Sequence, residues 1–286
     1  MAINYASKYE KKVAERFKLK SLTEAGINKD YTWAGVSTIN VYSVATQALN
    51  DYSLAANGVA RYGTPTDAAN TVQAMTVSKD RSFSIINDKK FADDTQGIME
   101  SGKILARQTE EIIIPEVDTY RLAVMNTAAI AAGGETLVAG SVSASGVAIT
   151  ASNAYLSLLY GAEYFGNSKV PVKGRICYCT YAFYNFLKLD AGFMLASEVA
   201  MNERINGMVG MVDGIKIVPV PSTYLPTSVA FILCHPAATV GADKLEDYKI
   251  HTDPPGISGS LIEGRIRYDA FVLTAKNKGV YTHLIL

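Results

Sequence analysis

Few residues of this chain could act as nucleophiles or soft metal ligands. They are three histidines and three cysteines: His235, His251, His283, Cys177, Cys179 and Cys234. Cys177 and Cys179 stand two apart on a predicted strand and so share one face, where two thiols could bridge or bind a metal. No second pair completes a metal site, so we interpret them as buried free thiols.

Cys234 and His235 are adjacent at the end of a predicted strand, where neighbouring side chains point to opposite faces. A cysteine–histidine nucleophile pair therefore remains an unsupported alternative. The three histidines do not pair at the spacing of helical metal ligands, and no H-E-x-x-H motif occurs.

The motifs that bind phosphate through glycine are also missing. No G-x-x-x-x-G-K-[ST] occurs, and the glycines between Gly207 and Gly214 fail the G-x-G-x-x-G spacing. Residues 256–260 do not form a G-x-S-x-G elbow. Glu110 and Glu111, on a predicted helix, are interpreted as a solvated or interface face. We therefore predict no enzymatic activity, no cofactor and no metal ion.

The composition favours association between copies. The chain has 286 residues, with 27 basic and 27 acidic side chains, so its formal net charge is zero. Charged residues make up only 19% of it, apolar residues 49%, and there are 17 tyrosines. Neutrality argues against a dedicated nucleic-acid binder, and the apolar content argues against disorder. Low net charge with abundant tyrosine is typical of interface-forming surfaces, an ordinary cytosolic protein being the alternative.

No membrane segment or signal peptide is predicted. The N-terminal residues contain no apolar stretch of the signal-peptide type, and the longest uncharged stretch, 136–162, is too polar to span a membrane. We expect synthesis in a reducing cytosol.

The first part of the chain looks unable to fold alone. Residues 1–55 form a lightly basic arm that we expect to lie on another surface. Residues 71–77 and 82–86 alternate partly between apolar and polar side chains, and the four residues between them are polar. This pattern predicts a β-hairpin over 71–87 that rests on a neighbouring surface, because a lone two-stranded ribbon is marginal in water.

The strongest periodicity predicts a long helix. Apolar or small residues recur every three to four positions from Thr95 to Ala128, and Gly133-Gly134 end the pattern. Asp93, Asp94 and Thr95 are candidate N-caps. Pro115 should kink this helix, and two helices broken at Pro115 are the alternative.

The second half alternates between helices and strands. We predict a helix over 153–165 capped by Thr150 or Ser152, and a hairpin at Asp213-Gly214. A strand over 175–180, a helix over 182–189 and a buried strand over 229–234 complete a compact α+β domain. The tail returns as a long strand over 261–273, a turn at 276–279 and a final strand over 280–286.

In this order the elements resemble the major capsid proteins of tailed phages, which have the α+β Hong Kong 97-type fold. The resemblance rests on residues 209–226, on the strand 261–273, and on Val170-Pro171 with the strand and helix that follow. It implies five parts: an N-terminal arm at 1–55, an E-loop β-hairpin at 56–94, a P-domain spine helix and strand at 95–150, an A-domain at 151–250, and P-domain return strands at 251–286.

The resemblance implies a structural protein. Such subunits assemble into hexamers and pentamers of an icosahedral head around double-stranded DNA, so we expect the chain in the virion after synthesis in the host cytoplasm. Expected partners are further copies, a separate scaffolding protein, portal and decoration proteins, and DNA held without sequence specificity; no membrane is expected. Eight residues are expected at contacts between subunits: Lys79, Asp80, Arg81, Phe83, Tyr5, Tyr9, Phe17 and Trp33.

Two other functions stay open at this point. An encapsulin-like shell around protein cargo would use the same fold, and a soluble α+β enzyme would be a small oligomer with a deep pocket. Covalent crosslinking between subunits is a further hypothesis, with Lys79, Lys89 and Lys90 available.

Overall fold

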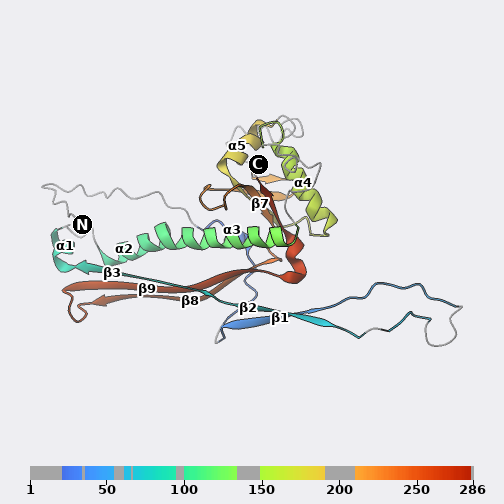
Figure 1. The fold of residues 1–286 in the computed structure, drawn as a ribbon. Coiled ribbons are helices and arrows are strands. Elements are labelled where there is room, and N and C mark those ends of the chain that lie inside the picture. The colour runs from blue at the N-terminus through green and yellow to red at the C-terminus, as the bar shows by residue number, and fades with distance from the viewer. Residues whose placement is uncertain are drawn as a thin grey trace.

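The fold was analysed in a computed structural model of the full chain. The structure describes residues 21–33, 36–54, 61–65, 67–94, 100–133, 149–190 and 210–284, excluding the side chains of Lys244 and Leu245. Figure 1 shows a long helical rod lying along a narrow sheet, a second unit at one end of the rod, and a thin ribbon that projects beyond that end.

The second unit is built on a five-stranded sheet with order β10-β7-β4-β6-β5. Its strands are β4 (Arg175–Thr180), β5 (Met211–Val212), β6 (Ile215–Val220), β7 (Val229–Cys234) and β10 (Val280–Leu284). β4 pairs with β6 in parallel and with β7 antiparallel. Every residue of β4 and β7 is buried, because helices cover both faces of the sheet.

One face of this sheet packs on α4 (Ala154–Asn167) and α5 (Tyr181–Leu189). The Thr180 hydroxyl accepts a hydrogen bond from the Phe183 amide and so caps α5. Between β5 and β6, Asp213 and Gly214 have φ of 48° and 74°, the left-handed pair that a tight hairpin turn requires. The predicted strands 175–180 and 229–234, the helix 182–189 and this hairpin are confirmed.

The rod covers the other face of the five-stranded sheet and continues along the narrow sheet (Figure 1). It consists of α2 (Ser101–Gln108), a π-helical turn (Thr109–Ile113) and α3 (Ile114–Ala131). The Ile114 amide donates to the Thr109 carbonyl, so the hydrogen bonds continue through the wider turn directly before Pro115. Pro115 therefore stands at the start of α3, where its missing N–H costs little.

The narrow sheet has three antiparallel strands in the order β3-β9-β8. They are β3 (Lys79–Asp88), β8 (Thr239–Thr252) and β9 (Gly259–Val272). Short helices flank this layer: α1 (Lys89–Asp94) follows β3, and η3 (Thr274–Gly279) connects β9 to β10. A single helical turn, η1 (Glu24–Gly26), lies near the start of the described chain.

The predicted hairpin over 71–87 is wrong in its pairing. β2 (Asn70–Thr76) pairs with β1 (Thr38–Val44), whereas β3 pairs with β9 in the narrow sheet. The projecting ribbon is therefore made by β1 and β2, and residues 38–44, predicted as part of an arm, form half of it. The β2–β3 connection is short, but β3 finds in β9 a partner along its whole length, with ten paired positions from Lys79 to Asp88.

Three other predicted limits also need correction. The segment 151–250 was predicted as one domain, but β8 lies within it and pairs with β9. β10, predicted with the P-domain return strands 251–286, pairs with β7 in the five-stranded sheet. The long helix was predicted to start at Thr95, but it begins at Ser101, because Glu100 directly before it is extended, with ψ of 135°; residues 95–99 lie outside the described residues. The residue that precedes α4 is Asn153, which accepts a bond from the Thr150 amide.

Candidate assembly surfaces

The cysteines do not offer a reactive thiolate. Cys177, Cys179 and Cys234 are free and buried, as predicted. Burial raises the pKa of the Cys234 thiol to about 12 and that of Cys177 well above its usual value. Because the thiolate is the nucleophile, Cys177 and Cys234 are unreactive at neutral pH.

The histidines are also engaged by the fold. His283 is fully buried, its ring stacks on Phe231 at 4.8 Å, and burial lowers its pKa to about 4. His235 Nδ1 accepts from the Ala237 amide, so its Nε2 donates to the Lys173 carbonyl at 3.1 Å. Within the described ranges, no group of three or more His, Cys, Asp or Glu side chains could hold a metal ion. In the same part of the chain, no helix is both long and apolar enough to cross a membrane.

The projecting ribbon has one outward face that carries large apolar side chains. Strand alternation places Tyr42, Val44 and Val72 on this face, and they are 66%, 70% and 51% exposed. Tyr42 and Val72 are directly paired across the two strands. The described residues of the chain therefore leave this face uncovered, and it is of the kind that marks protein contacts.

The ribbon continues beyond its two strands with the same character. The Ser53 amide donates to the Arg61 carbonyl, and the rings of Tyr52 and Tyr62 meet edge to face at 5.0 Å. Both rings are exposed, as are Leu49 and Leu54. From residue 36 to residue 77 the sequence holds only three charged residues, Asp51, Arg61 and Asp67. Such a surface is poorly solvated, and covering it with apolar neighbours lowers the free energy.

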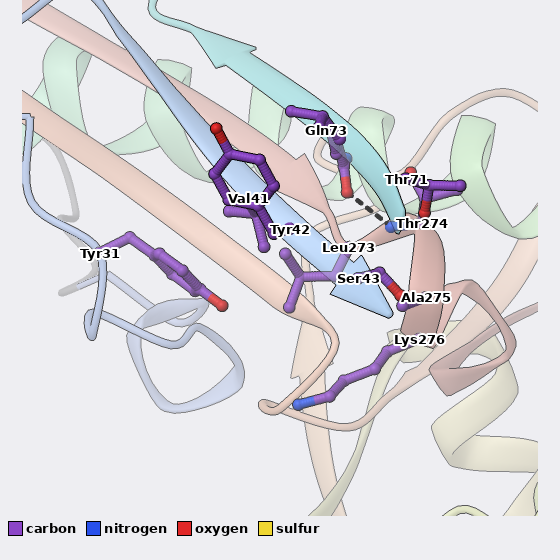
Figure 2. A pocket seen from close by; sticks show the side chains of 11 residues that line it. Tyr31, Val41, Tyr42, Ser43, Thr71, Gln73, Leu273, Thr274, Ala275 and Lys276 are labelled. Atoms are coloured by element: carbon purple, nitrogen blue, oxygen red, sulfur yellow. Dashed lines mark hydrogen bonds between the residues drawn. The ribbon is translucent and has the colours of Figure 1, made fainter. Parts of the chain in front are cut away.

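The root of the ribbon is attached to the body by a side-chain clamp. The Gln73 side chain donates to the Val272 carbonyl at 2.9 Å. It also accepts from the Thr274 amide at 2.7 Å (Figure 2). Trp33 lies beneath β2, donates to the Met75 carbonyl and stacks on Phe271. An open cavity of about 590 Å³ remains between the ribbon root, Tyr31 and residues 273–276. These contacts set the direction in which the ribbon leaves the molecule.

The segment before the ribbon is held on α3 by a buried polar network. The fully buried Asp118 carboxylate accepts hydrogen bonds from the Ser21 hydroxyl, the Leu22 amide and the Thr23 hydroxyl. One turn later, Arg121 forms ion pairs with Glu24 and Asp243 at 2.9 and 3.2 Å. The segment 21–28 is therefore part of the body of the molecule rather than a free arm.

Solved structures with the same arrangement come from phages. A Mycobacterium phage Che8 structure is similar with a TM-score of 0.72 at 16% identity, over 98% of this chain and 97% of that chain. The mature capsid of bacteriophage PhiM1 has a TM-score of 0.71 at 12% identity, over 98% and 92% of the two chains. The capsid of cyanophage P-SCSP1u has a TM-score of 0.71 at 14% identity, with the same shares.

This chain has the fold of phage capsid proteins. No protein-family model matches the chain, and no match to a curated protein is found. The shared capsid fold spans nearly the whole chain on both sides of the comparison, so the rod, the two sheets and the ribbon all belong to it.

Within this capsid fold, the predicted contact residues of β3 also have partners in their own chain. Lys79 Nζ lies 4.9 Å from the centre of the Tyr120 ring, and Arg81 pairs with Glu116 at 2.8 Å. Two arginines of β9, Arg265 and Arg267, hold Asp80, whose carboxyl pKa is lowered chiefly by the hydrogen bond from Arg265. The Phe83 ring is half-buried and faces Tyr248 on β8.

The other predicted contact residues divide into two groups. Trp33 is 2% exposed and packs within its own chain, so it offers no surface to a neighbour and that prediction is wrong. Tyr5, Tyr9 and Phe17 lie outside the described residues. The sequence reasoning missed the outward face of the ribbon, although the alternation Tyr42-Ser43-Val44 within an almost uncharged stretch was a usable signal.

Proposed function

We propose that this chain is a major capsid protein that assembles into the shell of a phage head. The observation that carries the proposal is the whole-chain likeness to capsid structures of PhiM1 and P-SCSP1u, over 98% of this chain. The exposed and nearly uncharged ribbon supports it, because such a surface is stable in water only when a neighbouring molecule covers it. A shell protein also has no need of the nucleophiles that the fold buries here.

The parts of the chain correspond to those of a Hong Kong 97-type subunit with revised limits. We assign the ribbon around β1 and β2 as the E-loop. The rod with the three-stranded sheet is the P-domain, and the five-stranded unit with α4 and α5 is the A-domain. The N-terminal arm is then confined to the residues before Ser21, since 21–28 is bound to α3.

The proposal includes partners and place. We infer that copies form hexamers and pentamers through the outward face of the ribbon, with Lys79, Asp80, Arg81 and Phe83 of β3 as further candidate contacts. The shell encloses double-stranded DNA in the virion, and the chain is made in the host cytoplasm. A separate scaffolding protein, a portal and decoration proteins complete the proposed set.

Electron microscopy of the expressed full chain tests the assembly. We expect closed shells, or shells after addition of the other head proteins from the same source. Shells filled with DNA in a propagating host support a phage head, whereas shells filled with host proteins point to an encapsulin-like compartment. A small species that stays soluble under all these conditions overturns both shell functions and returns the enzyme alternative.

A charge placed on the outward face gives a sharper test. Tyr42→Asp puts a carboxylate where an apolar contact is proposed and should abolish shells while leaving the circular dichroism spectrum of the subunit unchanged. Leu156→Asp, at an exposed apolar position on α4, is the matched control and should still assemble. Normal shells from the Tyr42 variant would remove the ribbon from the proposed contacts.

A further inference from the structure

Most cationic side chains of the described chain have an acidic or aromatic partner close by. Ion pairs bind nine of them: Lys29, Arg81, Lys89, Lys103, Arg107, Arg121, Lys249, Arg265 and Arg267. Lys169, Lys173, Lys276 and Lys278 are among the exceptions, as are the isolated Lys90 and Lys216, because no carboxylate of the described residues lies within 4 Å of their ammonium groups. Three of them, Lys169, Lys276 and Lys278, come from two segments that are about a hundred residues apart and meet in the fold.

The two segments form the walls of one cavity of about 460 Å³. One wall is the turn that ends α4, with Lys169, and the other is η3, with Lys276 and Lys278. No Asp or Glu lies among the described residues that line the cavity. The local charge is therefore strongly positive in a chain whose net charge is zero.

The backbone that carries these lysines is firmly held. The Arg175 guanidinium donates hydrogen bonds to the carbonyls of Val170 and Pro171, at 2.8 and 2.9 Å. His235 donates from Nε2 to the Lys173 carbonyl, and its own amide donates to the Gly279 carbonyl. His235 thus ties the two walls together with both ring nitrogens occupied. The cavity is preformed, which lowers the ordering cost of binding a ligand.

We propose that this cavity is a binding site for phosphate groups and that its ligand is the backbone of packaged DNA. The identity of the ligand rests on the proposed capsid function, whereas the phosphate chemistry rests on the lysines alone. Lysine attracts phosphate as a point charge and lacks the forked geometry with which arginine reads bases or holds planar groups. Contacts of this kind are independent of sequence and weaken with salt, so they restrain DNA without trapping it.

An acidic protein segment is the competing ligand, and the lining argues against it. Peptide segments are held mainly by large apolar or aromatic anchors that fill pockets. Besides the lysines, the lining consists of small or polar side chains, Val170, Pro171 and the engaged His235. Nothing in this cavity would anchor a peptide side chain, whereas phosphate needs only the charge.

Fluorescence anisotropy with a labelled double-stranded DNA of mixed sequence tests the site on the purified full chain. The double variant Lys276→Gln/Lys278→Gln removes two charges of the cavity. The matched control, Lys90→Gln/Lys103→Gln, removes two exposed lysines on α1 and α2, at the far end of the rod (Figure 1). We expect DNA binding about tenfold weaker for the cavity variant at low salt and unchanged for the control. The slope of log K against log salt should fall by about 2 in the cavity variant only.

The outcomes separate the possible ligands. Equal loss in both double variants, or no loss in either, overturns the site. Competition by poly-glutamate at matched charge concentration that displaces the DNA completely overturns DNA in favour of an acidic protein segment. Displacement by millimolar inorganic phosphate alone overturns the DNA assignment and leaves a site for a small phosphate. Binding is measured whether or not shells form, so failure of assembly and failure of this site are distinguishable.

Discussion

The five-stranded unit and the projecting ribbon are stabilised in opposite ways. In the unit, the strands β4 and β7 are buried along their whole length between helices on both sides. In the ribbon, two strands pair only with each other, and their outward face is uncovered. The first region obtains its stability within one chain, whereas the second is the surface that we propose a neighbouring copy covers. The comparison teaches that burial of apolar side chains within the chain is concentrated in the five-stranded unit, while the ribbon leaves its large apolar side chains exposed.

The largest expected effect is the difference in the free energy of unfolding between a substitution in the core and one in the ribbon. Phe231 is fully buried, with Phe183 4.6 Å away between ring centres, so Phe231→Ala should lower the free energy of unfolding by about 3–5 kcal/mol. Tyr42→Ala, on the exposed face, should change it by less than about 0.5 kcal/mol and yet reduce assembly. Urea unfolding and sedimentation of shells measure the two quantities. Equal losses of stability would contradict the contrast between the regions.

The second effect tests whether the segment 21–28 belongs to the folded end. Asp118→Ala removes the acceptor of three hydrogen bonds and leaves the buried Thr23 hydroxyl and two half-buried donors without it, which should cost about 3 kcal/mol. We expect faster hydrogen exchange at Leu22 and cleavage by protease near residues 20–30. Glu116→Ala, at a half-buried position two residues earlier on α3, is the control and should leave this segment protected. Unchanged exchange in the Asp118 variant would show that the segment is held elsewhere.

The third effect is a dependence of the free energy of unfolding on pH that arises from a buried histidine of the five-stranded unit. The pKa of His283 falls from 6.5 to about 4 because burial disfavours its charged form. The unfolded chain therefore binds a proton between these values that the folded chain does not, so stability falls as the pH falls through this window. From pH 7 to pH 5 the loss should be about 2 kcal/mol. In His283→Gln this contribution should disappear from urea unfolding curves, while His251→Gln, at an exposed position on β8, should retain it.

The smallest effect concerns the attachment of the ribbon. Gln73→Ala removes both bonds to the body and should cost about 1 kcal/mol or less, since the side chain is only half-buried. The change should appear as faster hydrogen exchange in β1 and β2, with the five-stranded unit unaffected. Asn40→Ala, on the outward face of the same ribbon, is the control. Equal protection of the ribbon in both variants would mean that the stack on Trp33 alone sets its direction.

Local patterns identified most elements of the five-stranded unit. The apolar run at 229–234 and the Asp-Gly turn at 213–214 each carry their signal within a few residues. The helical period of the apolar residues also predicted the rod. It did not predict the π-turn at 109–113, because that turn depends on how the helix accommodates Pro115. Burial of the cysteines followed from their place on apolar strands.

The pairing between distant segments could not be predicted from the sequence. β2 and β3 are separated by two residues and still belong to different sheets, because each finds a partner far along the chain. The same reason moved β8 out of the predicted A-domain and β10 into the five-stranded sheet. The lysines of the proposed phosphate site lie in two unremarkable loops, and neither loop alone indicates a site.

By itself the sequence determined the local elements, the inert chemistry of its thiols, and a composition of low charge that favours association. These features depend on side-chain period, turn residues and net charge, all of which are read within short windows. Only the tertiary structure decided which strands pair, that Trp33 is internal, and which surfaces remain uncovered. Those properties depend on contacts between residues far apart in the chain, where many pairings are compatible with the same local pattern and burial of the whole core selects one.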